Sequence, residues 1–440
     1  MKIIGKNLIN DSFFSTGIKV TLLRITGVGL QFITLFVITN AATEQLVGKY
    51  NFLNSIIIIL GSVCLLGMNN SFLQFSGKLT ANNNFEYLKT LYKKKLVILI
   101  ISALFFFFVF ILLSQVFKIG YFQDEAIKKL YFKIFILLLP YALTQFNYQV
   151  LRGLNLLFTS EVFRNIFRFG GFLLLVLTLL LTNNINKLLE AFIFIFGLLS
   201  FVSTVIVLKK FKNFENKNST LVISYKEILK TSLPMSFSFI SLQIMQGVDI
   251  FFLERYYSFE TVAFYGTAVK ISTVIGIILM SVNAIVAPKI ATLYYQKNLI
   301  ELKSIVEKST LFTFILSTPI IIIILIFSEN ILCLFGENYT IAKTALFIIL
   351  LGQIFNAFCG SVGVYLNMTG KQKTYQLILL IALIINIILN AILIPKYGMN
   401  GAAISTSFSL VFWNILGGVI IYRKDKMNIF VTSKLFKTKS

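Results

Sequence analysis

The chain has 440 residues, of which 57% are hydrophobic and only 13% are charged. Ordinary soluble domains are about 25% charged, so this composition excludes a water-soluble fold. The 40 Lys and Arg residues outnumber the 17 Asp and Glu residues, and the chain has no histidine, which excludes imidazole-based metal sites and histidine-dependent catalysis.

The apolar residues fall into separate runs of about 20, the length of a helix that crosses roughly 30 Å of hydrocarbon. Runs such as 56–60 and 105–110 are solidly apolar, whereas the strands of a membrane barrel alternate apolar and polar residues. The sequence therefore predicts an all-α integral membrane protein of about twelve transmembrane helices. In chain order we expect them near 17–39, 51–75, 96–117, 130–151, 162–182, 188–208, 231–254, 262–288, 310–328, 341–367, 375–394 and 399–422.

Lysine and arginine gather on alternate connections between the expected helices. The clusters at 93–95 and 209–217 and the basic C-terminal tail fall on one side, while most connections on the other side hold one cation. The positive-inside rule places the basic side, and with it both termini, in the cytoplasm. This placement also accounts for most of the net charge of +23, and no basic groove or nucleic-acid motif accompanies it, so we expect no nucleic-acid partner.

The longest polar interruption divides the expected helices six and six. Val47 to Tyr50 before the second helix matches Val262 to Tyr265 before the eighth, an offset of 215 residues. Because a six-helix unit starts and ends on one side, two copies would form a parallel repeat; chance similarity of apolar segments is the alternative. We expect an N-terminal six-helix bundle over 1–210, a cytoplasmic linker over 211–230, and a C-terminal six-helix bundle with a short basic tail over 231–440.

Charged side chains inside the expected helices are candidate functional residues, because a charge at the membrane centre costs roughly 2.5–3.5 kcal/mol. Lys19 lies near the inner end of the first helix, where its long side chain can reach the interface. Arg24 lies deeper, and Gly27 and Gln31 follow on its face. This pattern favours a wet or protein-lined surface around Arg24 and Gln31, with snorkelling of Arg24 as the alternative.

Arginines also gather where the fourth and fifth helices meet the cytoplasm. Arg152 ends the fourth helix, close to Arg164 and Arg168 at the inner mouth of the fifth. The planar fork of arginine suits phosphate oxygens, although the positive-inside rule alone would also place cations here.

The seventh and eighth helices each carry a polar face. Gln246 and Asp249 share a face of the seventh, and Lys270 lies between Thr267 and Thr273 on the eighth. Asp249 is the one acid that we place clearly inside a helix, so it is the candidate for ion coupling, with a structural role as the alternative. Two interpretations stay open, an Asp249–Lys270 ion pair that locks the helices, or a Lys270 that presents positive charge to an anionic substrate.

Five short motifs in the second half occur in order. They are Leu233-Pro234 followed by Asp249, Val262 to Lys270, Ala287-Pro288-Lys289-Ile290, Leu334 to Tyr339, and the turn Ile394-Pro395-Lys396-Tyr397-Gly398-Met399-Asn400-Gly401-Ala402-Ala403. In the last motif, Pro395 ends one helix, Gly398 permits a tight turn and Gly401 lets the next helix pack closely. With these motifs the chain resembles the polysaccharide transporter (O-antigen flippase) family of the multidrug/oligosaccharidyl-lipid/polysaccharide exporter superfamily.

The resemblance implies two six-helix bundles around a central cavity. Alternating access would move an undecaprenyl-pyrophosphate-linked oligosaccharide unit of O-antigen, capsule or a related polysaccharide across the bacterial inner membrane. Its expected partners are that glycan, membrane lipids, a polysaccharide polymerase and a chain-length regulator. No enzymatic reaction, cofactor or metal is expected, and no Walker sequence is present for ATP. The residues expected to line the cavity are Arg24, Gln31, Arg152, Gln246, Asp249 and Lys270.

Two other functions are open to a chain of this kind. A drug or cation antiporter of the same superfamily would rely on buried carboxylates, and one intramembrane Asp against two deep cations favours an anionic cargo instead. A membrane polysaccharide polymerase or ligase would need a sizeable outer catalytic domain, and the outer connections are short, the longest lying near 118–129.

Overall fold

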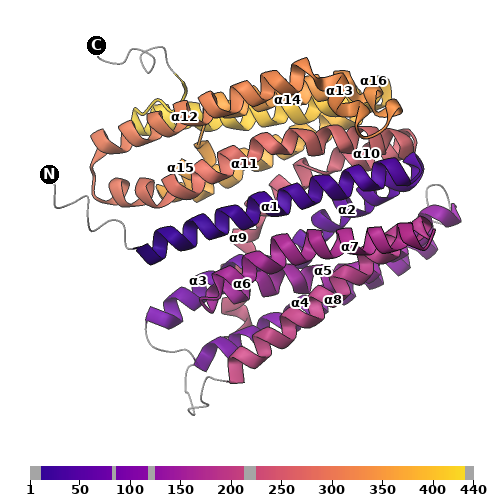
Figure 1. The fold of residues 1–440 in the computed structure, drawn as a ribbon. Coiled ribbons are helices and arrows are strands. Elements are labelled where there is room, and N and C mark those ends of the chain that lie inside the picture. The colour runs from indigo at the N-terminus through magenta and orange to yellow at the C-terminus, as the bar shows by residue number, and fades with distance from the viewer. Residues whose placement is uncertain (1–10, 82–85, 117–123, 213–223, 432–440) are drawn as a thin grey trace. The chain divides into compact units, whose positions relative to one another are not determined.

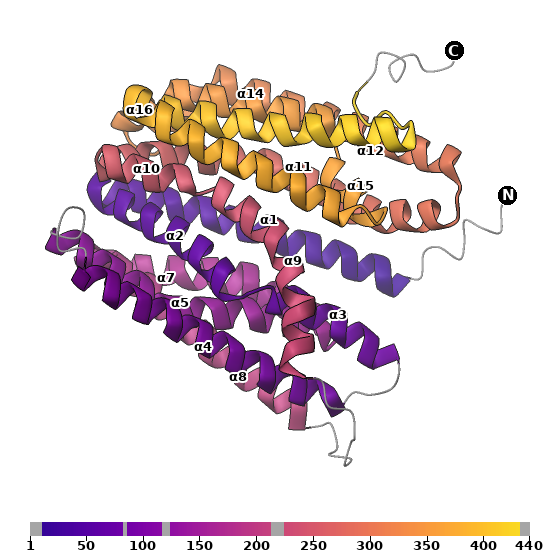
Figure 2. The same ribbon diagram turned by 180° about the vertical axis from the view of Figure 1, so that it is seen from behind.

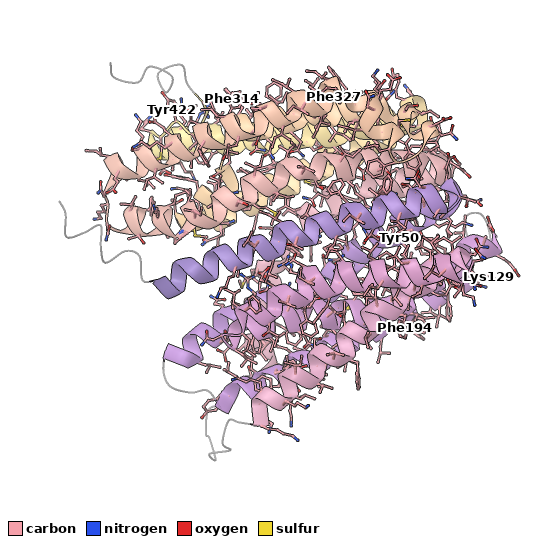
Figure 3. The ribbon with its side chains drawn as sticks, viewed as in Figure 1. Tyr50, Lys129, Phe194, Phe314, Phe327 and Tyr422 are labelled. Carbon is pink, nitrogen blue, oxygen red and sulfur yellow. The ribbon has the colours of Figure 1, made fainter. Side chains whose placement is uncertain are left out.

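The computed structural model describes residues 11–81, 86–116, 124–212 and 224–431, and every regular element in these ranges is a helix (Figure 1). Ten helical segments of this part are long and apolar enough to cross a membrane. Outward faces carry large apolar side chains such as Phe194 and Phe327, which are 60% and 52% exposed (Figure 3). Such faces suit a lipid environment, so the all-α membrane fold is confirmed.

The chain divides into two compact units. Unit 1 comprises Met1–Leu46 and Ile56–Ile240, and unit 2 comprises Val47–Ser55 and Ser241–Ser440. The predicted boundaries at 210 and 231 stay a prediction. Much of the predicted linker, at 213–223, and the end of the basic tail, at 432–440, lie outside the described residues.

Unit 1 is organised around α5, which packs against α3, α4 and α8, while α1 packs against α7 and the π-helical turn η2 (Figures 1 and 2). Its elements are α1 (Asp11–Ala41), α2 (Glu44–Cys64), α3 (Met68–Ala81), α4 (Glu86–Val116), α5 (Glu125–Gly153), α6 (Leu157–Glu161), η2 (Val162–Phe167), α7 (Arg168–Leu181), the 3-10 turn η3 (Ile185–Lys187), α8 (Leu188–Lys212) and the first part of α9 (Tyr225–Met245).

Unit 2 is organised around α16, which packs against α10, α14 and α15, while α11 packs against α12 and α14. Trp413, the one tryptophan of the chain, lies on α16 against Tyr375, with ring centroids 6.0 Å apart. The elements are the stretch of α2 named above, the end of α9, α10 (Val248–Tyr256), α11 (Phe259–Tyr295), α12 (Leu299–Ile326), α13 (Ser328–Cys333), the 3-10 turn η4 (Glu337–Ala342), α14 (Lys343–Cys359), α15 (Val362–Met368) and α16 (Gln372–Asp425).

The starts of α2 and α11 are capped in the same way. The Thr43 side chain accepts from the backbone N–H of Leu46, and the Ser258 side chain accepts from that of Thr261. Such caps satisfy backbone donors that have no partner inside the helix. The two caps are again 215 residues apart, which adds a structural correspondence to the sequence repeat.

Three expected helices are interrupted, which corrects their prediction as continuous spans. The expected helix 51–75 breaks after Cys64, where Leu66 and Gly67 have φ of 46° and 73°. The expected helix 231–254 breaks at Gly247, and the expected helix 341–367 breaks at Gly360, with φ 67° and ψ −135°. Positive φ ends the right-handed helix at the first and third of these breaks, whereas Gly247 has φ −144°. Apolar composition alone does not reveal where either conformation occurs.

The turn expected between the last two helices is present. Gly398 has φ 55° and ψ −132° and joins the two arms of α16. The arms lie against each other, because Asn386 Nδ2 donates to the carbonyl oxygen of Ser405 at 3.3 Å. A Cβ on Gly401 would lie 2.4 Å from the carbonyl oxygen of Leu393, so the close packing expected of this glycine is confirmed.

The break at Gly360 makes this residue sensitive to substitution. A Cβ here would lie 2.3 Å from Thr310 Oγ1, and the backbone conformation is one that only glycine adopts readily. We expect Gly360→Ala to lower the free energy of unfolding by about 2 kcal/mol or more. Thermal unfolding in detergent, followed by circular dichroism, measures this effect. Gly29→Ala is the control, since nothing lies within 4 Å of the added methyl; equal midpoints for both variants would contradict the prediction.

Candidate functional site

The deep arginine of α1 is paired with a buried acid of α6. Arg24 donates from Nε and Nη2 to the two carboxylate oxygens of Glu161, at 3.1 and 2.9 Å. The Glu161 side chain is 1% exposed and that of Arg24 is 33% exposed. Asn165 Nδ2 also donates to Glu161, at 3.1 Å, and a Cβ on Gly27 would lie 2.6 Å from that of Asn165. The face of α1 around Arg24 is therefore lined by protein.

Further arginines surround this pair. Glu161 is followed directly by the π-helical turn η2, a rare element that is frequent at functional sites. This turn carries Arg164, and Arg168 begins α7. The Arg164 guanidinium interacts electrostatically with Glu161, Arg24, Arg152 and Arg168. Unit 1 thus gathers four arginines around one glutamate.

One face of α5 completes this cluster. Tyr141, Tyr148 and Arg152 follow each other at spacings of seven and four, which places them on one side of the helix. Tyr148 Oη donates to the carbonyl oxygen of Phe163 at 3.2 Å, and Ser160 Oγ donates to that of Tyr148 at 2.8 Å. Both tyrosines interact electrostatically with the arginines of η2 and α7. These bonds fix the backbone that carries the arginines.

The lysine of α11 lies against α2 within unit 2. Lys270 Nζ donates to Asn51 Oδ1 at 2.7 Å and lies 4.8 Å from the centre of the Tyr50 ring, which Figure 3 labels. Gly266 permits this approach, because a Cβ there would lie 2.7 Å from Asn51 Nδ2. In the described part of the chain, Asn51 Nδ2 and Thr267 Oγ1 are buried without a hydrogen-bond partner. Lys270 therefore adjoins two polar groups with unused hydrogen-bonding capacity.

Asp249 has neutral partners. Its carboxylate accepts from Tyr265 Oη at 2.5 Å, from Thr406 Oγ1 at 3.1 Å and from the backbone N–H of Ile250 at 2.8 Å. The break at Gly247 places this 1% exposed residue in the first turn of α10, where the helix dipole favours negative charge. The interpretation of Asp249 and Lys270 as an ion pair is therefore wrong, because each residue hydrogen-bonds to uncharged side chains instead.

The other predicted residues lie as follows. Gln31 is half-buried on α1, Arg152 is half-buried at the end of α5, and Gln246 is exposed at the break between α9 and α10. Arg24 and Arg152 belong to the same arginine cluster. Gln31 and Gln246 belong to neither of the clusters described above. Their roles as cavity residues stay a prediction. Among the described residues, no three His, Cys, Asp or Glu side chains lie close enough together to hold a metal ion.

Sequence reasoning missed several buried charges at the boundaries of the expected helices, among them Glu161 and Lys95. Glu161 lies one residue before the expected helix 162–182, so Asp249 is not the one acid inside the membrane region. Lys95 belongs to a predicted cytoplasmic cluster, but it is 0% exposed and donates to Ser71 Oγ at 2.5 Å and to the carbonyl oxygen of Met68 at 3.2 Å. Each residue directly precedes an expected helix, which is the available signal that it enters the bundle.

Sequence profiles of two known families match the chain. The sequence profile of the family described as "Polysaccharide biosynthesis protein" matches residues 16–294, more than half of the chain. The chain belongs to this family. The match covers both the arginine cluster of unit 1 and Lys270 of unit 2, and it confirms the family that the sequence motifs indicate. A second profile, MatE, matches residues 234–392.

Curated proteins similar to this chain carry related names. The capsular polysaccharide biosynthesis protein CapF of Staphylococcus aureus is 26% identical over 46% of this chain and 51% of the relative. A Shigella flexneri protein, provisionally named an O-antigen transporter, is 32% identical over 40% of this chain and 42% of the relative. The chain thus spans about half the length of the curated relatives it matches.

A solved structure extends the comparison of the fold. The lipid II flippase MurJ in an inward closed conformation superposes with a TM-score of 0.73 and 16% sequence identity, covering 95% of this chain and 88% of MurJ. The chain is accordingly a multi-pass membrane protein whose helical fold resembles that of MurJ.

Proposed function

We propose that the chain is a flippase for a lipid-linked glycan of a bacterial surface polysaccharide. In this proposal, alternating access moves an undecaprenyl-pyrophosphate-linked oligosaccharide unit from the inner to the outer leaflet of the inner membrane, and both termini are cytoplasmic. A polysaccharide polymerase and a chain-length regulator would use the product. The family membership and the names of the relatives support a glycan substrate.

The observation that carries the proposal is the environment of Lys270. This cation lies in a membrane helix, and the groups that contact its ammonium in the described part are an amide oxygen and an aromatic ring. A cation in a low-dielectric region needs an opposing charge. A diphosphate supplies that charge, and the unused groups of Asn51 and Thr267 can bond its oxygens.

The charge balance of unit 1 supports the same substrate class. Four arginines face one glutamate there, so the cluster keeps positive charge after Arg24 and Glu161 pair. An antiporter of cationic drugs would instead need an excess of carboxylates. The positive excess of this cluster in unit 1 therefore favours an anionic cargo.

Deletion of the gene and complementation with the intact chain test this function. We expect the deletion strain to lose its surface polysaccharide and to accumulate the lipid-linked unit on the cytoplasmic leaflet, where glycosidase reaches it in inverted vesicles but not in spheroplasts. Complementation should reverse both effects. Normal surface polysaccharide in the deletion strain would refute the proposal.

A drug or cation antiporter is the second candidate. It is favoured by the MatE match over 234–392, which contains the buried carboxylate of Asp249. The same deletion strain separates the two functions. If the chain is a flippase, the deletion strain should be as sensitive to cationic drugs as the wild type. If it is an antiporter, the deletion strain should be more sensitive, and the Asp249→Asn variant should fail to restore resistance.

A further inference from the structure

The arginines of unit 1 differ in how their guanidinium groups are satisfied. The fork of Arg24 is filled by Glu161. Arg168 stacks on two phenylalanine rings, with centroids at 4.9 and 5.3 Å, and Arg152 donates one long bond of 3.4 Å to a glutamine. Arg164 has neither a hydrogen bond nor an ion pair among the described residues, only electrostatic neighbours.

The backbone that carries Arg164 is nevertheless held firmly. On one side, Tyr148 Oη binds the carbonyl oxygen of Phe163, the preceding residue. On the other side, the side chain of Asn165, the following residue, bonds to both the carbonyl oxygen and the carboxylate of Glu161. A half-buried guanidinium on a fixed backbone is preorganised for a ligand, because little freedom is lost on binding.

The ligand that fits this position is an anion with several oxygens. Arg164 offers unused N–H donors in a planar fork, and Arg152 brings a second guanidinium into its electrostatic range. Arginine forks match phosphate oxygens in geometry and charge. A second anion would also relieve the repulsion among four like charges around one acid.

We propose that unit 1 contains a phosphate-binding site formed by Arg164 and Arg152, and that Glu161 limits its affinity by holding Arg24 out of it. This inference rests on the proposed flippase function and names the residues that hold the phosphate in unit 1. It assigns Arg24 a positioning role, because the guanidinium of Arg24 is already hydrogen-bonded to the carboxylate of Glu161. The phosphate is that of the lipid-linked substrate or of an anionic phospholipid headgroup.

Titration of inorganic pyrophosphate into the purified full chain in detergent tests the site. We expect Arg164→Gln to weaken binding roughly 10- to 100-fold, as expected for loss of charge-assisted bonds. Glu161→Gln should strengthen binding about tenfold, because it removes the opposing charge and frees Arg24. The matched controls are Glu190→Gln and Lys133→Gln, which break an exposed ion pair of 2.7 Å between α8 and α5 and should leave the affinity unchanged.

A double variant protects the test against misfolding. In Arg24→Gln with Glu161→Gln, two neutral amides replace the ion pair and can still bond to each other. If Arg24 is a positioning residue, this variant binds pyrophosphate at least as tightly as the wild type. Loss of binding in the double variant would make Arg24 a direct ligand and overturn the inference.

The remaining outcomes separate this inference from the proposed function. Unchanged affinity in Arg164→Gln together with weakened affinity in Lys270→Gln would refute the site in unit 1 and leave the flippase proposal standing. No pyrophosphate binding by either the wild type or Glu161→Gln would refute both.

Competition in nanodiscs distinguishes the two sources of the phosphate. If phosphatidylglycerol, but not phosphatidylcholine, displaces pyrophosphate from the wild type, the site supports binding of a phospholipid headgroup. Equal pyrophosphate affinity in both lipids supports binding of the substrate diphosphate.

Discussion

Replacing Arg24 by alanine is expected to destabilise unit 1 by about 3–5 kcal/mol, because the Glu161 carboxylate would stay buried without its paired guanidinium. The acid is 1% exposed and its contacts with Arg24 are 2.9 and 3.1 Å long, so solvent cannot easily replace the lost partner. Thermal unfolding in detergent, followed by circular dichroism, measures the loss.

The companion variant removes both charges. Arg24→Ala combined with Glu161→Ala should regain most of the lost stability, because no unpaired buried carboxylate remains. If the double variant were as unstable as Arg24→Ala alone, the pair would not be the cause. A loss of glycan export in Arg24→Ala alone would therefore report folding as much as transport.

Replacing Lys270 by methionine is expected to abolish glycan export while the protein stays inserted and folded. Methionine keeps the apolar stem and removes the positive charge that the proposal assigns to the diphosphate. Because Lys270 bonds to the neutral amide of Asn51, its removal strands no buried acid, in contrast to Arg24→Ala. Surface polysaccharide and protein abundance in complemented deletion cells measure export and insertion.

Two controls frame this experiment. Lys270→Arg keeps the charge and should retain part of the export activity, and Lys343→Met removes an exposed cation that pairs with Glu329 at 2.7 Å and should retain all of it. Full export in Lys270→Met would remove this residue from the proposed substrate site.

Hydrophobic run length predicts the helices well, because each must cross a fixed apolar thickness. It does not predict the interruptions at Leu66 and Gly360, because tertiary contacts determine positive φ at particular positions in an apolar run. The tight turn at Gly398 is predictable, because Pro395 and two glycines mark it in the sequence.

The candidate site is less predictable than the fold. Helical periodicity assigns Arg24, Asp249 and Lys270 to polar faces, but it does not reveal which neighbouring helix each face meets. The partner of Arg24 proved to be Glu161, outside the expected helix, because helix boundaries are the least certain feature of a sequence. The partner of Lys270 proved to be Asn51. Because the Asn51 amide is uncharged, a search of the sequence for an opposite charge does not find it.

The distribution of Trp413 and Cys64 has a practical consequence for all of these stability measurements. The sole indole fluorophore lies in unit 2, and Cys64 provides a thiol in unit 1 that is 0% exposed. With Cys333 and Cys359 replaced by serine, indole emission and thiol labelling would report the melting of the two units independently in one sample. On heating a variant such as Arg24→Ala, Cys64 should then be labelled at a lower temperature than in the wild type. The emission of Trp413 should change only at a higher temperature than this labelling.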